Sequence, residues 1–153
     1  MNQETIEQLI RECMAETQKA IDSGNTPYGC LLTDSEGTVL ARAHNTVLAD
    51  SDPSAHAEVN AIKQLCRKLK RFDLPEVIVF ANAESCPMCL SCALRAGVTR
   101  FYFGARTDQS RVNPSISANE LAATAKQKVT IRSGILEKEC QEQIAAGYAK
   151  LKT

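Results

Sequence analysis

Apolar residues near the start of the chain recur three or four positions apart, which is the spacing of one helix face. Gly24 follows the last of them, and glycine is common directly after a helix end. The pattern predicts a helix from about Gln3 to Asp22. Its inward-facing positions are Ile6, Leu9, Ile10, Cys13, Met14, Thr17, Ala20 and Ile21.

Two short apolar runs come next, "YGCLLT" over residues 28–33 and "TVLARA" over residues 38–43. The four residues from Asp34 to Gly37 separate them, which predicts a β-hairpin with glycine at the end of its turn. After a polar loop, we expect a helix over Ala55–Lys70. Ser54 is its predicted N-cap, and Glu58 lies in its first turns.

The rest of the chain alternates strand and helix patterns. "EVIVF" (76–80) and "TRFYFG" (99–104) have the composition of buried strands, and a helix between them starts at Pro87 and is closed by Gly97. We expect a surface loop over residues 105–118, a strand over 128–133 and a final helix over Glu137–Leu151. This alternation indicates a parallel sheet covered on its faces.

Length and composition indicate one globular domain over residues 1–153. Hydrophobic residues make up 44% and charged residues 24%, and the formal net charge is zero, so there is no electrostatic reason to expect a nucleic-acid or membrane surface. The acidic N-terminus differs from a signal peptide, and no apolar stretch is long enough to cross a bilayer. We therefore expect a cytoplasmic protein whose seven cysteines stay reduced.

Two of these cysteines lie three positions apart at a predicted helix start. In "SCPMC", Cys86 and Cys89 can converge on one ion, and the helix N-terminus stabilises both thiolates. Taken alone, the pair is as compatible with two small buried residues or a redox couple as with a metal site. A closed structural zinc site would need a second pair, but the cysteines at 13, 30, 66 and 140 are isolated.

His56 also lies near a predicted helix start and completes a set of three ligands. Three protein ligands leave the fourth position of a tetrahedral zinc ion to water, as in catalytic zinc sites. Glu58 follows two residues later, and in a first helical turn its carboxylate can border the same pocket. The sequence therefore predicts one Zn²⁺ per chain on His56, Cys86 and Cys89, with Glu58 as the proton-transferring base.

These residues resemble the cytidine deaminase-like superfamily of zinc-dependent deaminases, whose signature joins H-x-E to P-C-x-x-C. The corresponding segments here are "HAE" and "ESCPMC". Four further segments are similar in order and separation: "TPYGCLL", "AHN", "DPSAHAEVNAI" and "SGILEKEC". The resemblance extends from about Pro27 to Cys140.

The resemblance implies a three-layer α/β/α sandwich around a five-stranded mixed sheet. It also implies a hydrolytic deamination of a base with release of ammonia, and a homodimer. Asn45 corresponds to a residue that binds the base as a hydrogen-bond donor, and Tyr28 to a wall of the substrate pocket. The structural alternatives are an ordinary turn asparagine and a core aromatic residue.

Two residues close to the signature are unusual: a serine in place of proline and an additional cysteine. Ser85 stands where the family usually has proline, which restores a backbone N–H and loosens φ next to the metal pocket. Cys92 is a third thiol, one more turn along the helix. It lies too far from Cys86 to share an ion with it, so we expect it to be a packing residue.

Three branches of the family compete for the substrate. "FGAR" and "VTIRSGILEKEC" resemble bacterial tRNA adenosine deaminases, but the loop before that ending differs and the chain is neutral. A basic run over residues 67–71 is best explained by the dipole of a solvated helix end. Guanine deaminases share "HAEV" and "CPMCL", yet the acidic residue expected between Asp108 and Glu120 is missing.

Fungal-type cytosine deaminases are similar to this chain in the predicted β-hairpin. On balance we expect a small-molecule substrate, namely a free nucleobase, a nucleoside or a related heterocycle of the guanine or cytosine type. Deamination of tRNA adenosine to inosine is the alternative, with tRNA as the partner. A catalytically silent zinc-binding paralogue is a third hypothesis, for which Ser85 is the hint.

Overall fold

The computed structural model describes residues 1–106 and 115–152. The predicted loop over 105–118 therefore falls largely outside the described residues, while Ala105 closes a strand and Ala118 opens a helix. In chain order the elements are α1 (Gln3–Asp22), β1 (Gly29–Thr33), β2 (Val39–His44), α2 (Val47–Asp50), α3 (Ala57–Leu69), β3 (Ile78–Ala83), α4 (Pro87–Arg95), β4 (Arg100–Ala105), α5 (Ala118–Ala123), β5 (Thr130–Arg132) and α6 (Glu137–Leu151).

The strands form one five-stranded mixed sheet in the order β2-β1-β3-β4-β5. β1 runs antiparallel to both of its neighbours, and β3, β4 and β5 run parallel to one another. The parallel part follows from the crossover through α4, because a helix between two strands returns the chain to the same edge of the sheet. The predicted mixed five-stranded sheet is confirmed.

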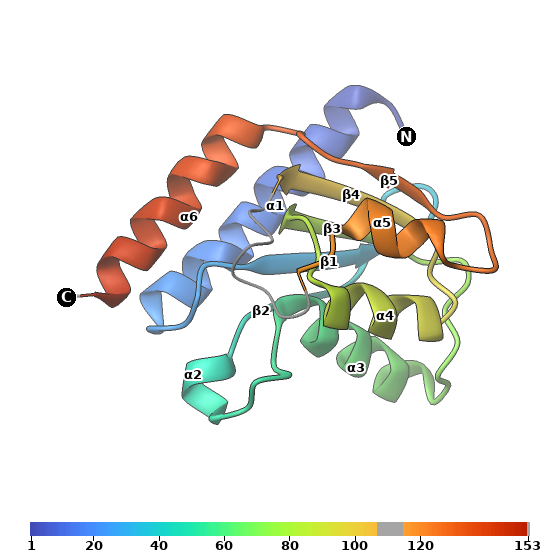
Figure 1. The fold of residues 1–153 in the computed structure, drawn as a ribbon, viewed down its shortest axis with the longest axis horizontal. Coiled ribbons are helices and arrows are strands. Elements are labelled where there is room, and N and C mark those ends of the chain that lie inside the picture. The colour runs from blue at the N-terminus through green and yellow to red at the C-terminus, as the bar shows by residue number, and fades with distance from the viewer. Residues whose placement is uncertain (107–114, 153) are drawn as a thin grey trace.

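Helices cover both faces of this sheet (Figure 1). α1 and α6 pack on one face, and α3 and α4 pack on the other, where α5 joins α4. Each face has its own apolar core, and the strands β1 and β3 between the two cores are buried along their whole length. The predicted three-layer sandwich is therefore confirmed. None of the described helices has the length and apolar character needed to span a bilayer.

The element boundaries differ from the predictions at two places that matter for the site. α3 begins at Ala57 with His56 as its N-cap, so the prediction of Ser54 as the N-cap is wrong. The Ser54 hydroxyl instead donates to Asp52 within the preceding turn, at 2.7 Å. β3 spans 78–83 rather than 76–80, because Val77 still belongs to a turn in which its N–H donates to Leu74.

Two short helices were not predicted from the spacing of apolar residues. α2 has only four residues, too few to show a helical repeat, and the Asn25 side chain holds it by accepting from the Ala49 N–H at 3.0 Å. α5 has six residues and begins with a capping box between Ser117 and Glu120. Both helices are therefore specified by capping and side-chain hydrogen bonds rather than by a face of apolar residues.

The start of β1 lies against α1 at a point where only glycine fits. A Cβ atom on Gly29 would overlap the backbone of Cys13 and Thr17 in α1. This close approach fixes the end of β1 that carries Tyr28, one residue earlier.

Candidate metal centre and substrate pocket

Two helices begin next to each other with a predicted metal ligand at each start. His56 is the N-cap of α3 and Cys86 is the N-cap of α4, and both have extended backbones with φ of −69° and −67°. Neither side chain caps its own helix. Cys89 lies one turn inside α4 and is buried. Two helix N-termini therefore present their ligands to one point, where their dipoles stabilise thiolates.

The three predicted ligands form a compact group. His56 Nδ1 lies 3.6 Å from Cys86 Sγ and 3.3 Å from Cys89 Sγ, and all the ligand atoms lie within 4.8 Å of one another. Tetrahedral bonds of about 2.3 Å to sulfur and about 2.0–2.1 Å to nitrogen place S and N about 3.6 Å apart. The observed spacing and the donor set, two sulfurs and one imidazole nitrogen, fit a zinc ion.

Hydrogen bonds within the group shift the pKa values of the two thiols in opposite directions. The hydrogen bond with Cys89, followed by that with His56, lowers the pKa of Cys86 to about 4. The pKa of Cys89 is raised well above its usual value, first by the hydrogen bond with Cys86 and then by burial. The bond with Cys86 also raises the pKa of His56. The group therefore holds at least one thiolate at neutral pH, as a metal ligand requires.

Glu58 lies in the first turn of α3 and is 8% exposed. Its Oε1 accepts a hydrogen bond from the Ser85 hydroxyl at 3.1 Å. Burial is the main cause that raises the pKa of this carboxyl, and interaction with Cys89 among others lowers it. Cys92 lies outside the group and packs against the core on its side of the sheet, as predicted. The carboxylate thus lies beside the ligands, in a largely dry position.

The two residues that the resemblance placed in the substrate pocket lie side by side. The Asn45 N–H donates to the Tyr28 carbonyl at 3.0 Å. Asn45 directly follows β2 and is buried, and its Oδ1 accepts from the Val47 N–H at 3.0 Å. Among the described residues, no group accepts a hydrogen bond from the Asn45 Nδ2. The side chain is therefore fixed at its oxygen and still has a donor to offer.

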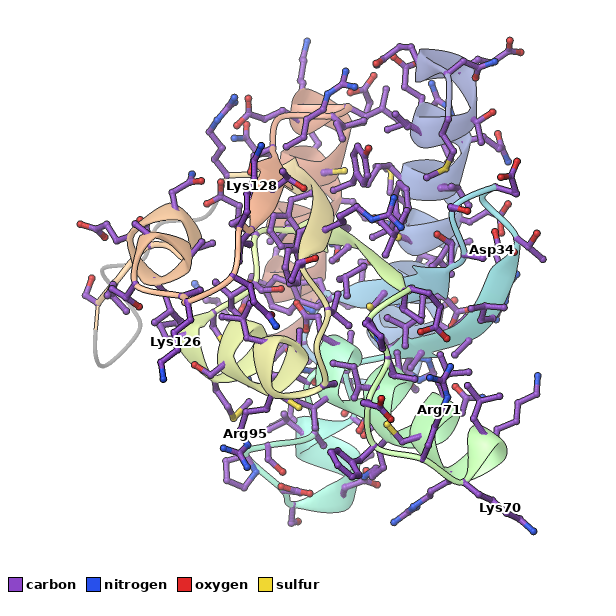
Figure 2. All side chains as sticks on the ribbon, turned by 90° about the vertical axis from the view of Figure 1, so that its right-hand side faces the viewer. Asp34, Lys70, Arg71, Arg95, Lys126 and Lys128 are labelled. Atoms are coloured by element: carbon purple, nitrogen blue, oxygen red, sulfur yellow. The ribbon has the colours of Figure 1, made fainter. Side chains whose placement is uncertain are left out.

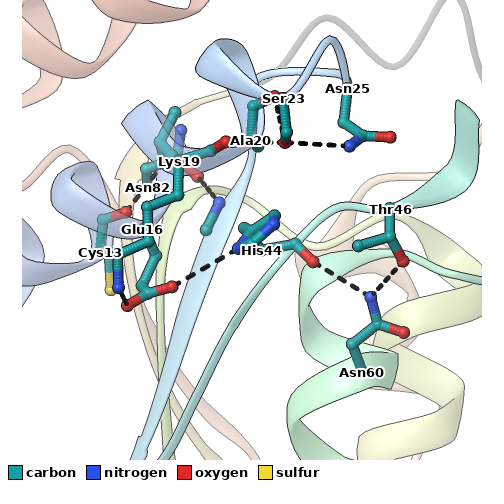
Figure 3. Close-up of polar contacts among 12 residues, drawn as sticks. Cys13, Glu16, Lys19, Ala20, Ser23, Asn25, His44, Thr46, Asn60 and Asn82 are labelled. Atoms are coloured by element: carbon teal, nitrogen blue, oxygen red, sulfur yellow. Dashed lines mark hydrogen bonds and ion pairs between the residues drawn. The ribbon is translucent and has the colours of Figure 1, made fainter. Parts of the chain in front are cut away.

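Asn60, which sequence reasoning missed, ties this segment to the helix that carries His56 (Figure 3). Its Nδ2 donates to the His44 carbonyl and to Thr46 Oγ1, each at 3.0 Å, and to the Ala55 carbonyl at 3.3 Å. On the other side, His44 Nδ1 lies 3.6 Å from Glu16 Oε2 in α1. One amide thus fixes both flanks of Asn45 relative to the start of α3.

Asn82 has the corresponding role for Tyr28. It is buried in β3, where its Oδ1 accepts from the Gly29 N–H at 2.9 Å and its Nδ2 donates to the Pro27 carbonyl at 3.1 Å. Both residues beside Tyr28 are therefore held by one side chain. The available signal was a lone amide inside the apolar run "VIVFANA", because a buried amide requires partners.

Tyr28 also meets the last helix. Its hydroxyl lies 2.9 Å from that of Tyr148 in α6, and the two rings pack edge to face with centroids 6.1 Å apart. Tyr28 is thus paired with a second tyrosine from the other end of the chain. No local pattern in the sequence pairs them, because 120 positions separate the two residues.

The basic run lies away from the metal group. Lys70 extends from the molecule at the C-terminal end of α3, with Arg71 near it (Figure 2), and the 13 residues of the helix, about 20 Å, separate this end from His56. Arg71 pairs with Glu76. Lys70 closes the helix in a left-handed conformation. This placement agrees with a solvated helix end.

Relatives with named activities match most of the chain. The tRNA-specific adenosine deaminase of Bacillus subtilis is 27% identical over 146 residues, which cover 95% of this chain and 90% of that protein. The chloroplastic tRNA(adenine(34)) deaminase of Arabidopsis thaliana is 32% identical over 155 residues, which cover 90% of this chain but only 12% of that much longer protein.

A solved structure, from a study of A-to-I editing by tRNA:A34 deaminases at the wobble position, superposes with a TM-score of 0.79. It is 26% identical in sequence, and the match covers 89% of this chain and 98% of that chain.

These comparisons correct the substrate expected from the sequence. A free nucleobase, nucleoside or small heterocycle was the wrong main prediction, because the curated relatives that align with 90–95% of this chain are named as tRNA adenosine deaminases. That prediction gave too much importance to the neutral net charge and to the divergent loop before the segment "VTIRSGILEKEC". Net charge describes the sum over the whole surface and does not report the surface around a site.

The family model described as the cytidine and deoxycytidylate deaminase zinc-binding region matches residues 3–105, which include His56, Glu58 and both cysteines of the group. The solved neighbour agrees in fold, and the ligand atoms have the spacing that zinc requires. The chain therefore belongs to the cytidine and deoxycytidylate deaminase zinc-binding family.

Proposed function

We propose that this protein is a zinc-dependent deaminase that converts adenosine to inosine in tRNA. One observation carries the proposal: relatives named as tRNA adenosine deaminases align with 90–95% of this chain, and the aligned chain has a complete His/Cys/Cys group. The buried Glu58 carboxylate beside this group favours an enzyme over a silent zinc-binding paralogue, because zinc binding alone requires the three ligands but no buried base.

In the proposed reaction, water replaces the amino group at C6 of adenine and ammonia leaves. His56, Cys86 and Cys89 would hold the zinc ion, which activates water for attack when it is bound. Glu58 accepts a proton from that water and passes protons to the purine ring and to the departing amine. Its burial suits this role, because a raised pKa makes the carboxyl a better proton carrier near neutral pH.

Asn45 and Tyr28 are the proposed substrate-binding residues. The Asn45 amide is anchored through its oxygen, so its Nδ2 is directed by the fold and can donate to an acceptor on the purine. Tyr28, backed by Tyr148, supplies an aromatic surface on which an unstacked base can pack. Both contacts suit a base presented in a single-stranded loop rather than in a duplex.

The test compares RNA with free bases in the same preparation. A tRNA anticodon stem-loop with adenosine at the wobble position should be converted to inosine, detected by nucleoside analysis, while guanine and cytosine release no ammonia. Binding should weaken steeply as salt is raised, since phosphate contacts release counterions. Release of ammonia from a free base at a higher kcat/KM than from the RNA would contradict the proposal.

Glu58→Gln is the matched variant for the mechanism. It keeps the shape of the side chain and removes its ability to accept a proton, so turnover should fall by about 10²–10⁴-fold. Zinc content should stay near one ion per chain, which separates loss of the base from loss of the metal.

The homodimer implied by the family resemblance remains a prediction, which sedimentation of the purified protein tests.

A further inference from the structure

Ser85 occupies an unusual position for a serine in this molecule. It lies in the short connection between the end of β3 and Cys86, and it is 1% exposed. Its hydroxyl donates to Glu58 Oε1 at 3.1 Å, across the gap between the starts of α3 and α4. The contact thus joins the residue beside one predicted zinc ligand to the predicted base beside another.

The geometry leaves the two oxygens of Glu58 with different tasks. An ionised carboxylate only accepts hydrogen bonds, so the serine hydroxyl is the donor. Ser85 engages Oε1 and not Oε2, and the carboxyl also interacts with Cys89, one of the predicted zinc ligands. A glutamate side chain has three rotatable bonds, and fixing one oxygen removes much of that freedom before the substrate arrives.

Resting on the proposed function, we propose that Ser85 is a positioning residue for the Glu58 carboxylate, whose hydroxyl holds Oε1 so that Oε2 remains directed at the reacting water. Ser85 does not itself touch the substrate or transfer a proton. A proline at this position, as the family resemblance implies for other members, has no hydroxyl to offer, so the contact belongs to this chain rather than to the signature.

The alternative is that the hydrogen bond between Ser85 and Glu58 only satisfies two buried polar groups. That alternative predicts a change in folding stability when the hydroxyl is removed, with no selective effect on the chemical step. A positioning role predicts a lower kcat at unchanged KM, because an interaction needed only in the transition state is lost. The two explanations therefore differ in a measurable way.

The experiment uses the zinc-loaded protein and the wobble-adenosine stem-loop. Ser85→Ala should lower kcat about tenfold and leave KM and zinc content unchanged. Ser85→Thr keeps a hydroxyl on Cβ and should restore most of the lost kcat. Ser133→Ala is the matched control, because Ser133 Oγ is buried but has no hydrogen-bond partner in the described structure, and its kcat should equal that of the unmodified protein.

A crystal structure of Ser85→Ala supplies a readout that needs no substrate. The carboxylate should leave its position or occupy several rotamers, while the sulfur and imidazole positions stay fixed. A wild-type kcat in the alanine variant, a loss of activity fully explained by lost zinc, or an unmoved carboxylate would each overturn the proposal. If the unmodified protein fails to deaminate the RNA, the proposed function fails, and the crystal structures still decide the role of Ser85.

Discussion

The candidate metal group and the proposed substrate-binding residues lie in neighbouring segments but are held in place in different ways. The three candidate metal ligands come from two helix starts: His56 is placed by α3, and both cysteines are placed by α4. Tyr28 and Asn45, the proposed substrate-binding residues, lie beside the ends of β1 and β2, and side chains from other elements hold the adjoining backbone in place.

This difference explains why a local motif predicts the metal ligands, whereas the substrate-binding residues are held by contacts between distant parts of the chain. A helix start fixes its N-cap within a few residues, so a short motif suffices to specify the ligand group. The placement of the proposed substrate-binding residues depends on Asn60 and Asn82, which reach 14 and 53 residues along the chain to Thr46 and Gly29. Loss of either amide leaves backbone groups without partners in a buried place, which costs stability.

The largest effect should come from the metal side. Cys89→Ser replaces a buried thiolate ligand with a hydroxyl that stays protonated, so the protein should lose nearly all its zinc and all measurable activity. Cys92→Ser is the control, because Cys92 lies on the same helix but outside the ligand group. Elemental analysis should find zinc in the control alone. Full zinc content in Cys89→Ser would show that the ligand set is different.

The next effect concerns the stability of the zinc-stripped protein. Burial raises the pKa of Glu58, so the folded state binds this proton more tightly than the unfolded state does. Ionisation therefore destabilises the fold as the pH rises from the usual glutamate range through the folded pKa, and the penalty is absent below that range. A tenfold difference in proton affinity between the folded and unfolded states corresponds to about 1.4 kcal/mol.

Glu58→Gln carries no charge, so at neutral pH it should be more stable than the unmodified protein. The difference should shrink as the pH falls towards about 4, where both states bind the proton. Urea unfolding of both proteins after zinc removal measures it. A glutamine variant that is less stable at neutral pH than the unmodified protein would show that the ionised carboxylate is well stabilised in the fold.

On the pocket side, Asn60→Ala should have a moderate effect. It removes the amide that fixes both flanks of Asn45, so the free energy of unfolding should fall by about 1–3 kcal/mol and KM should rise several-fold. Zinc content should be unchanged if the two regions are built independently. Gln64→Ala changes an exposed side chain on the same helix and should alter neither quantity. Loss of zinc from Asn60→Ala would instead join the two regions into one unit.

The smallest effect is expected from Tyr148→Phe. It removes one hydroxyl from the pair with Tyr28 and keeps the edge-to-face packing of the rings. We expect KM to change by no more than about twofold, because the ring packing is kept, and the free energy of unfolding to fall by about 1 kcal/mol, the net contribution of one hydrogen bond. Steady-state kinetics on the stem-loop checks this. A much larger rise in KM would identify the hydroxyl pair, rather than the ring, as the part that meets the base.

The sequence predicted the long elements well and the short ones poorly. α1 was predicted with its observed ends because twenty residues repeat one apolar face. α2 and α5 have four and six residues and are fixed by Asn25 and by the Ser117 cap, which periodicity does not detect. The predicted N-cap of α3 was two residues early, because Ser54 is a good capping residue that serves the preceding turn instead.

The sequence by itself identified the three residues that the structure brings together as a possible metal site. His56, Cys86 and Cys89 were identifiable because helix starts, residue type and spacing restrict where a ligand can point, and Glu58 followed from its place in the same first turn. Only the tertiary structure decided what surrounds that chemistry. Contacts such as Ser85 to Glu58, Asn82 to Gly29 and Tyr28 to Tyr148 join residues 27 to 120 positions apart. No local pattern specifies such partners, because they meet only when the sheet and its two helical layers have packed.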